Sequence, residues 1–155
     1  GLTGAEVVTE WCFNLDSLLD PQLLSATSFT QTGLFILPTI TLQADGYKAD
    51  GDGHYDIHVR FDNSGGSTHR FGAGDELQFV FSYSGSGSFS ASSFNVLSKP
   101  EAGASGFFSA AHVISTGTDG LGSAWIAAVP EPSAALQALL ATGAGLMLSR
   151  RRRPD

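Results

Sequence analysis

Apolar and polar residues alternate most strictly between residues 54 and 61. The apolar positions are Tyr55, Ile57, Val59 and Phe61, and the polar positions between them are His54, Asp56, His58 and Arg60. A period of two predicts a β-strand with one buried face and one face in water. A second alternating run holds Leu77, Phe79, Phe81 and Tyr83. We expect these two strands to pair as antiparallel neighbours.

Shorter extended segments fill most of the chain up to Val129. The first is predicted at residues 7–15, with Trp11 and Phe13 on one face and Cys12 on the other. Leu18 to Leu24 reads as either a short helical turn or a loop. Further strands are predicted within residues 27–42, divided by Gly33 and Pro38, and at residues 94–97, 107–114 and 123–127. About eight short strands without helical periodicity favour an all-β fold, an antiparallel β-sandwich that is jelly-roll-like or Ig-like.

The last stretch, residues 129–155, has a different pattern. It reads VPEPSAALQALLATGAGLMLSRRRRPD, and residues 133–149 carry no charge. A helix over residues 133–149 would be roughly 25 Å long, just short of a bilayer's hydrocarbon thickness of about 30 Å. A cluster of arginines at its end is expected to stay on the cytoplasmic side. The pattern therefore predicts a single C-terminal transmembrane helix with the body outside; the alternative is an amphipathic or core helix capped by arginines.

These residues resemble the PEP-CTERM sorting signal of Gram-negative bacteria. The Val129-Pro130-Glu131-Pro132 box, the uncharged run and the basic end of Arg150, Arg151, Arg152 and Arg153 occur in the family's order. The resemblance implies that an exosortase recognises the box and removes the anchor during export through the inner membrane. It divides the chain into an exported β-sandwich domain, residues 1–129, and a sorting signal, residues 130–155. No signal peptide is visible at the start, so we expect the export signal to have been removed or left out.

The body also resembles a set of uncharacterised PEP-CTERM exported proteins. The similar blocks are KADGDGHYDIHVRFD, RFGAGDEL, ASSFNVLS, AAHVIS and SAWIA. This second resemblance supports the predicted β-sandwich and the predicted export to the cell surface or matrix, and it implies no enzymatic reaction.

Charge and cysteine content narrow the function further. The formal net charge is −7, and four of the eight basic residues lie in the terminal arginine run. The body is therefore strongly acidic, which disfavours nucleic acid as a partner because a phosphate backbone needs a basic face. Cys12 is the only cysteine. It cannot form an intramolecular disulfide and is expected to be buried.

Three carboxylates are the best candidates for binding a metal ion. Asp50, Asp52 and Asp56 lie within seven residues, separated by glycines, and could surround a structural Ca²⁺, with Asp45 adding a ligand from upstream. The match to an EF-hand loop is poor, because the bidentate glutamate is missing and a strand follows instead of a helix. The alternative is a tight hairpin turn, in which the aspartates bond to the local backbone.

Other candidate chemistry is weaker. His54, Asp56 and His58 share a strand face, but positions i and i+4 lie about 13 Å apart, so a metal site would also need His69 or His112. Hydrogen-bonded or solvated histidines are the expected case.

Catalysis has little support, because no nucleophile elbow is present, and Asp56, Asp75 and Glu76 show no diagnostic spacing for glycoside hydrolysis. The aromatic residues Tyr47, Tyr55, Phe107, Phe108 and Trp125 are expected in the core, or alternatively stacked on sugars.

The leading hypothesis is a non-enzymatic surface or matrix protein, structural or adhesive in exopolysaccharide or biofilm, with exosortase and the inner membrane as partners during sorting. One alternative is a carbohydrate-binding module, braced by calcium, that contacts extracellular polysaccharide. Another alternative is a secreted hydrolase, which needs two carboxyl groups converging in a cleft.

Overall fold

The computed structural model describes residues 2, 4–50, 53–66, 68–101 and 105–128. In this part of the chain all regular structure is β-strand apart from two short 3₁₀ helices. The strands are β1 (Val7–Phe13), β2 (Leu24–Thr32), β3 (Thr39–Ala49), β4 (Gly53–Arg60), β5 (Phe71–Gly72), β6 (Glu76–Tyr83), β7 (Ser109–Thr116) and β8 (Gly122–Ala128); the helices are η1 (Pro21–Leu23) and η2 (Ala91–Phe94).

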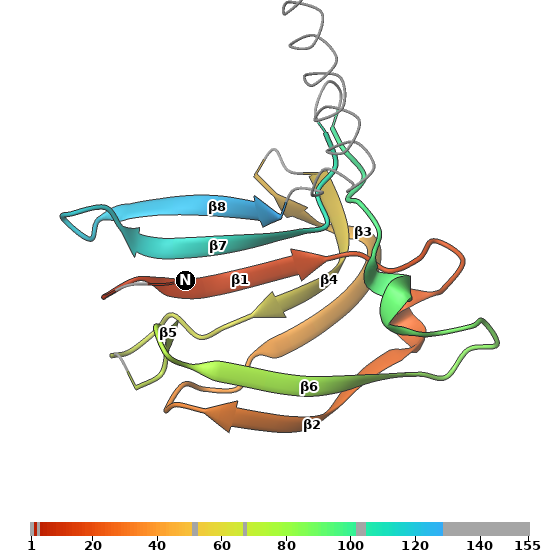
Figure 1. Cartoon of the computed structure of the whole chain (residues 1–155), viewed down its shortest axis with the longest axis horizontal. Helices are drawn as coiled ribbons and strands as arrows, with labels where there is room; N and C mark the ends of the chain where they lie inside the picture. The colour runs from red at the N-terminus through yellow and green to blue at the C-terminus, as the bar shows by residue number, and fades with distance from the viewer. Residues whose placement is uncertain (1, 3, 51–52, 67, 102–104, 129–155) are drawn as a thin grey trace, which may run out of the picture.

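The strands form two antiparallel sheets (Figure 1). The larger has the order β3-β4-β1-β7-β8, with the two-residue β5 pairing beside β1, and the smaller contains β2 and β6. Every strand pair is antiparallel. The all-β, antiparallel prediction is confirmed for the described residues.

The main core lies between the two sheets. In β4, residues Tyr55, Ile57 and Val59 are fully buried while the intervening polar residues remain partly or wholly accessible, as the period of two predicts. Ile57 and Val59 join a cluster with Phe13 of β1 and Leu24 of β2, and the side chains of the alternating run in β6 pack against it. Trp11 and Phe13 share one face of β1, with ring centroids 4.7 Å apart. Cys12, on the other face of β1, belongs to a smaller cluster that also contains Ala49, Ala110 and, near the start of β4, Tyr55.

The expected pairing between the two alternating runs is wrong. The first run, in β4, pairs with β1 on one side and β3 on the other, and the second run, in β6, pairs with β2. Both runs contribute apolar side chains to the same core. Their apolar faces therefore meet across the core, in two different sheets, and their backbones do not pair.

Two segments between strands have 3₁₀ geometry. η1 settles the alternative left open for Leu18 to Leu24: the Asp20 carboxylate accepts a hydrogen bond from the Gln22 N–H, and Pro21 occupies the first turn. The strand expected at residues 94–97 is wrong, because η2 ends at Phe94 and the following residues are irregular up to an isolated bridge between Lys99 and His54.

The predicted sorting segment, residues 129–155, lies outside the described residues. Among the helices that are described, none is long and apolar enough to cross a membrane.

Candidate functional site

The carboxylate of Asp56 connects three segments at one end of the larger sheet. Its Oδ2 accepts a hydrogen bond from the Leu15 N–H at 3.0 Å, and its Oδ1 accepts one from the Asp45 N–H at 2.7 Å. The Asp56 N–H in turn donates to Asn14 Oδ1 at 3.0 Å. Asp45 lies where β3 bulges away from β4 between Leu42 and Tyr47. The carboxylate therefore satisfies the backbone of this bulge and of the segment that follows β1.

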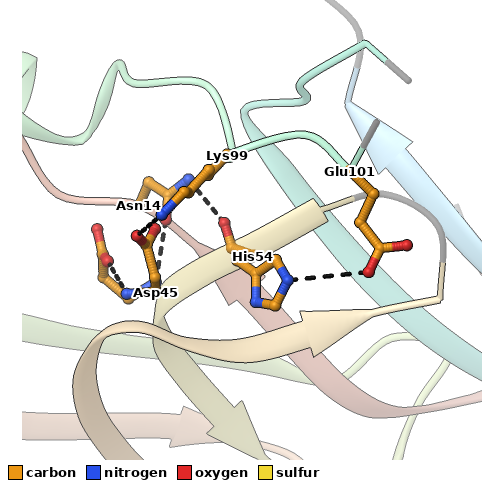
Figure 2. Close-up of polar contacts among 6 residues, drawn as sticks. Asn14, Asp45, His54, Lys99 and Glu101 are labelled. Carbon is orange, nitrogen blue, oxygen red and sulfur yellow. Dashed lines mark hydrogen bonds and ion pairs between the residues drawn. The ribbon is translucent and has the colours of Figure 1, made fainter. Parts of the chain in front are cut away.

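Charged side chains surround the hairpin between β3 and β4 (Figure 2). Lys99 Nζ lies 2.7 Å from Asp45 Oδ2, and Lys48 Nζ lies 2.7 Å from Glu101 Oε1. The hydrogen bond to Asp45, and secondarily its charge, raise the pKa of Lys99. The hydrogen bond from Lys48, followed by its charge, lowers the pKa of Glu101. All four side chains are substantially exposed. These ion pairs therefore connect the loop around Lys99 to the hairpin but contribute little to the free energy of unfolding.

The predicted calcium ligands are only partly brought together. Asp45 and Asp56 line one hollow of about 330 Å³, together with Asn14 and Lys99. Asp56 already accepts two backbone N–H groups and Asp45 already pairs with an ammonium group. Asp50 lies in the exposed turn after β3, and Asp52 is outside the described residues. Across the residues that are described, no three His, Cys, Asp or Glu side chains form a group able to hold a metal ion. The calcium site, which includes Asp52, stays a prediction.

The turn alternative has direct support from the strand pairing. Ala49 pairs with Gly53, so β3 and β4 are consecutive strands of one hairpin joined by residues 50–52. Gly53 has φ +98°, a conformation that favours glycine.

A row of polar and aromatic side chains crosses the larger sheet on the face away from β2 and β6. It contains Tyr47, His58, Glu10, His112 and Trp125, one residue from each of β3, β4, β1, β7 and β8. We call it the cross-sheet row. His58 Nε2 lies 3.0 Å from Glu10 Oε2, and Glu10 is the direct cross-strand partner of His112. The rings of Tyr47 and His58 have centroids 5.0 Å apart, as do those of His112 and Trp125.

The structure gives polar side-chain contacts for three of the four histidines, two of them in the cross-sheet row. His58 bonds to Glu10, His112 Nδ1 lies 2.8 Å from Thr9 Oγ1, and His54 lies 3.8 Å from a Glu101 oxygen. The contacts of His58 and His112 confirm the prediction of hydrogen-bonded histidines, whereas the 3.8 Å contact of His54 is too long for a hydrogen bond. His69 lies apart from them, in the segment between β4 and β5.

An apolar groove opens on the other side of the larger sheet, between β1 and β6. It has a volume of about 660 Å³ and is lined mainly by aromatic rings, among them Trp11, Phe79, Phe81 and Phe108, with Gln78 and Ser109 as its polar groups. Trp11 is 37% exposed. No local pattern in the sequence predicts this groove, although both β1 and β6 are strands that the sequence predicts. The missing information was that β1 and β6 belong to different sheets and so leave a space between them.

The other aromatic candidates fall into two groups. Tyr55 is fully buried, which removes it as a sugar-stacking residue. Tyr47 and Trp125 are half-buried and pack against the cluster around Cys12. These two residues therefore lie between the two predicted alternatives, a position in the core and an exposed position that stacks on sugars.

The carboxylates considered for hydrolysis also have backbone partners. Asp75 Oδ2 accepts the Gly72 N–H at 2.8 Å, which closes the turn before β6. Asp75 and Glu6 line a hollow of about 350 Å³ beside Arg70. Asp56, the other candidate, lies in the different hollow beside Lys99.

Comparison with known proteins gave no match to a protein-family model, to a curated protein or to a solved structure.

Proposed function

We propose that this chain is a non-enzymatic exported protein, delivered to the cell surface or extracellular matrix by a PEP-CTERM signal that an exosortase reads. The observation that carries the proposal is the order of three features in residues 129–155: a Pro-Glu-Pro box, an uncharged run and four arginines. Each feature has a separate physical role, as a helix-blocking recognition segment, a span and a cytoplasmic stop.

The body suits a structural or adhesive role in an extracellular polysaccharide layer. It is acidic, and several of its carboxylates, among them Asp56, Asp75 and Glu101, bond to local backbone or to a surface lysine. A two-layer β-sandwich, jelly-roll-like or Ig-like, would hold such a body together without a cofactor.

The test compares the full chain with a variant lacking residues 130–155, both expressed behind an export leader in a Gram-negative host that has an exosortase. The full chain is expected in the envelope fraction before processing, and the truncated chain is expected dissolved outside the inner membrane. A matched pair of point variants refines this test. Glu131→Gln should block processing, seen as an unchanged intact mass, while Glu76→Gln should leave processing normal. A truncated chain that is still held in the membrane would overturn the proposal.

A second candidate, carbohydrate binding, has one supporting observation. The groove between β1 and β6 offers Trp11 beside several phenylalanines, and aromatic faces stack on the apolar faces of sugar rings. Trp11→Ala should then abolish binding to the host's exopolysaccharide, measured by calorimetry, while Leu18→Ala, at a highly exposed position outside the groove, should not. Equal binding by both variants would remove this candidate. The same titration with and without a calcium chelator tests the predicted calcium brace.

A further inference from the structure

Strand β8 is an exposed edge of the larger sheet. It lies at one end of the order β3-β4-β1-β7-β8, and β7 is its strand partner (Figure 1). An edge strand leaves half of its backbone N–H and C=O groups without a partner in the sheet, and these groups can pair with another strand. Ile126, next to the central residue Trp125 of β8, is 57% exposed. The described fold therefore leaves this edge open.

The composition of β8 does nothing to block such pairing. Residues 122–128 read GSAWIAA, with no charge and no proline. Its register with β7 runs without interruption from Ser123 to Ala128, and the one irregularity lies on the β7 side, at Ser115. Natural proteins commonly protect an edge with lysines, prolines or bulges.

Two of the other described edges, β3 and β2, carry such protection. β3, at the opposite end of the larger sheet, bulges between Leu42 and Tyr47 and carries the charged residues Asp45 and Lys48. β2 is irregular between Thr27 and Thr30, where Ser28 has φ +55°. In β6 the charged residue is Glu76, at the first position, and the rest of that edge is uncharged as well. Within the larger sheet, β8 is therefore the edge that lacks such protection.

We propose that β8 pairs antiparallel with β8 of a second copy of this chain, joining the two larger sheets into one. The backbone pattern of a strand edge complements itself when the partner runs antiparallel, which gives an isologous two-fold contact. The absence of charge in β8 means that the pairing brings no like charges face to face. Full overlap of the seven residues places the two-fold axis at Trp125, so that Ser123 faces Ala127 of the second copy.

This register gives a direct test by disulfide formation. Within one strand, positions 123 and 127 lie about 13 Å apart, beyond the reach of a disulfide of about 7 Å. Across the proposed interface they lie directly opposite one another, within reach. The double variant Ser123→Cys/Ala127→Cys of the full chain, held in mild detergent, should form a covalent dimer under a mild oxidant. The native Cys12 is buried and does not compete.

Matched controls separate this contact from association through the apolar tail. Gln78→Cys/Ser82→Cys has the same spacing on exposed positions of β6, so contact driven by the tail would cross-link both double variants equally. Adding Ile126→Lys to the β8 variant should slow cross-linking about fivefold, because in this register it places two ammonium groups diagonally across the interface, about 7–8 Å apart, where like charges repel. Val80→Lys, at a residue of similar exposure (55%), should leave the rate unchanged.

Equal cross-linking of the two double variants, or a rate that Ile126→Lys does not change, would overturn the pairing. The outcome does not depend on the proposed export of the chain, because the cross-linking is measured on purified protein. A chain that is exported as proposed but stays monomeric would refute this inference alone.

Discussion

The Asp56 side chain connects β4 to two other segments, although it lies on the accessible face of the strand. Its two carboxylate oxygens accept N–H groups from residues 11 and 41 positions earlier in the chain. An amide in its place keeps the shape but turns one acceptor into a donor, which would then face a backbone N–H. A buried or half-buried N–H left without an acceptor costs more than an ordinary hydrogen bond contributes.

Asp56→Asn should therefore lower the free energy of unfolding by about 1–3 kcal/mol, measured by urea denaturation at pH 7. Asp50→Asn, in the exposed turn at the end of the same hairpin, should change it by no more than about 0.5 kcal/mol. Repeating both measurements with calcium added tests the predicted metal site. If Asp50, Asp52 and Asp56 share a calcium ion, both variants should lose a calcium-dependent stabilisation that the unmodified protein shows. Equal, calcium-independent stabilities of the two variants would contradict the structural role given to Asp56.

Cys12 is protected by its surroundings in the smaller core cluster. Burial, with a smaller contribution from the charge of Glu10, raises the pKa of its thiol from 9.0 to about 12. In the unfolded chain the thiol ionises first, so its contribution to stability is undiminished below pH 9 and declines as the pH rises from 9 toward 12. Because the thiolate is the reactive form, the folded protein should resist iodoacetamide at pH 8. The protein unfolded in urea should react fully in the same time, as counted by intact mass. Rapid modification of the folded protein would contradict the burial of Cys12.

At the scale of elements, the β3–β4 hairpin depends on a close approach of two backbones. The Lys99 carbonyl accepts a hydrogen bond from the His54 N–H at 2.9 Å, and a Cβ added at Gly53 would lie 2.5 Å from that carbonyl oxygen. The carbonyl cannot retreat without lengthening the hydrogen bond. Gly53 is therefore required both by its φ of +98° and by the space available.

Gly53→Ala should destabilise the fold by about 3 kcal/mol, since backbone strain and the collision add together. Gly74→Ala is the matched control: Gly74 has φ +85° with nothing within 4 Å of an added Cβ, so it should cost only about 1–2 kcal/mol of backbone strain. Thermal unfolding followed by circular dichroism measures both. Equal losses of stability in the two variants would mean that the close contact with Lys99 does not add to the destabilisation.

The elements also show what a sequence pattern can and cannot predict. Alternation identified β4 and β6 because a half-buried strand must place every second side chain in the core. The same alternation could not identify their neighbours, because it defines a strand's face and says nothing about its edges. Asp45 and Asp56 line the same hollow, and their closeness in sequence is enough to suggest that they lie near each other. Lys99, which neutralises Asp45, comes from 54 residues away, and no local pattern predicts that contact. The groove at Trp11 was missed for the same reason.

For the molecule as a whole, aromatic rings connect the two sheets. Phe81 of β6 contacts Phe13 of β1 and Phe94 of η2, with ring centroids 6.1 and 5.4 Å apart. Phe94 also contacts Phe13 directly, at 5.9 Å. The smaller sheet has only two strands, and a two-stranded sheet is marginally stable in water by itself. Its stability must therefore come from these contacts with the larger sheet.

If the sheets fold as one unit, Phe81→Ala should weaken regions far from Phe81. We expect a loss of about 3 kcal/mol, since a ring that bridges two layers leaves a cavity when removed. Phe29→Ala is the control, because that ring is 38% exposed and contacts Phe79 of the paired strand within the smaller sheet; it should cost no more than about 1.5 kcal/mol. The measurement is urea unfolding followed by the fluorescence of one tryptophan at a time, in Trp11→Phe and Trp125→Phe backgrounds. Trp11 lines the groove beside β6, whereas Trp125 lies in β8 on the opposite face of the larger sheet. The midpoints reported by both tryptophans should fall together, because a cooperative domain unfolds in one transition. A midpoint at Trp125 that stays fixed while the one at Trp11 falls would show that the larger sheet holds its structure without the smaller one.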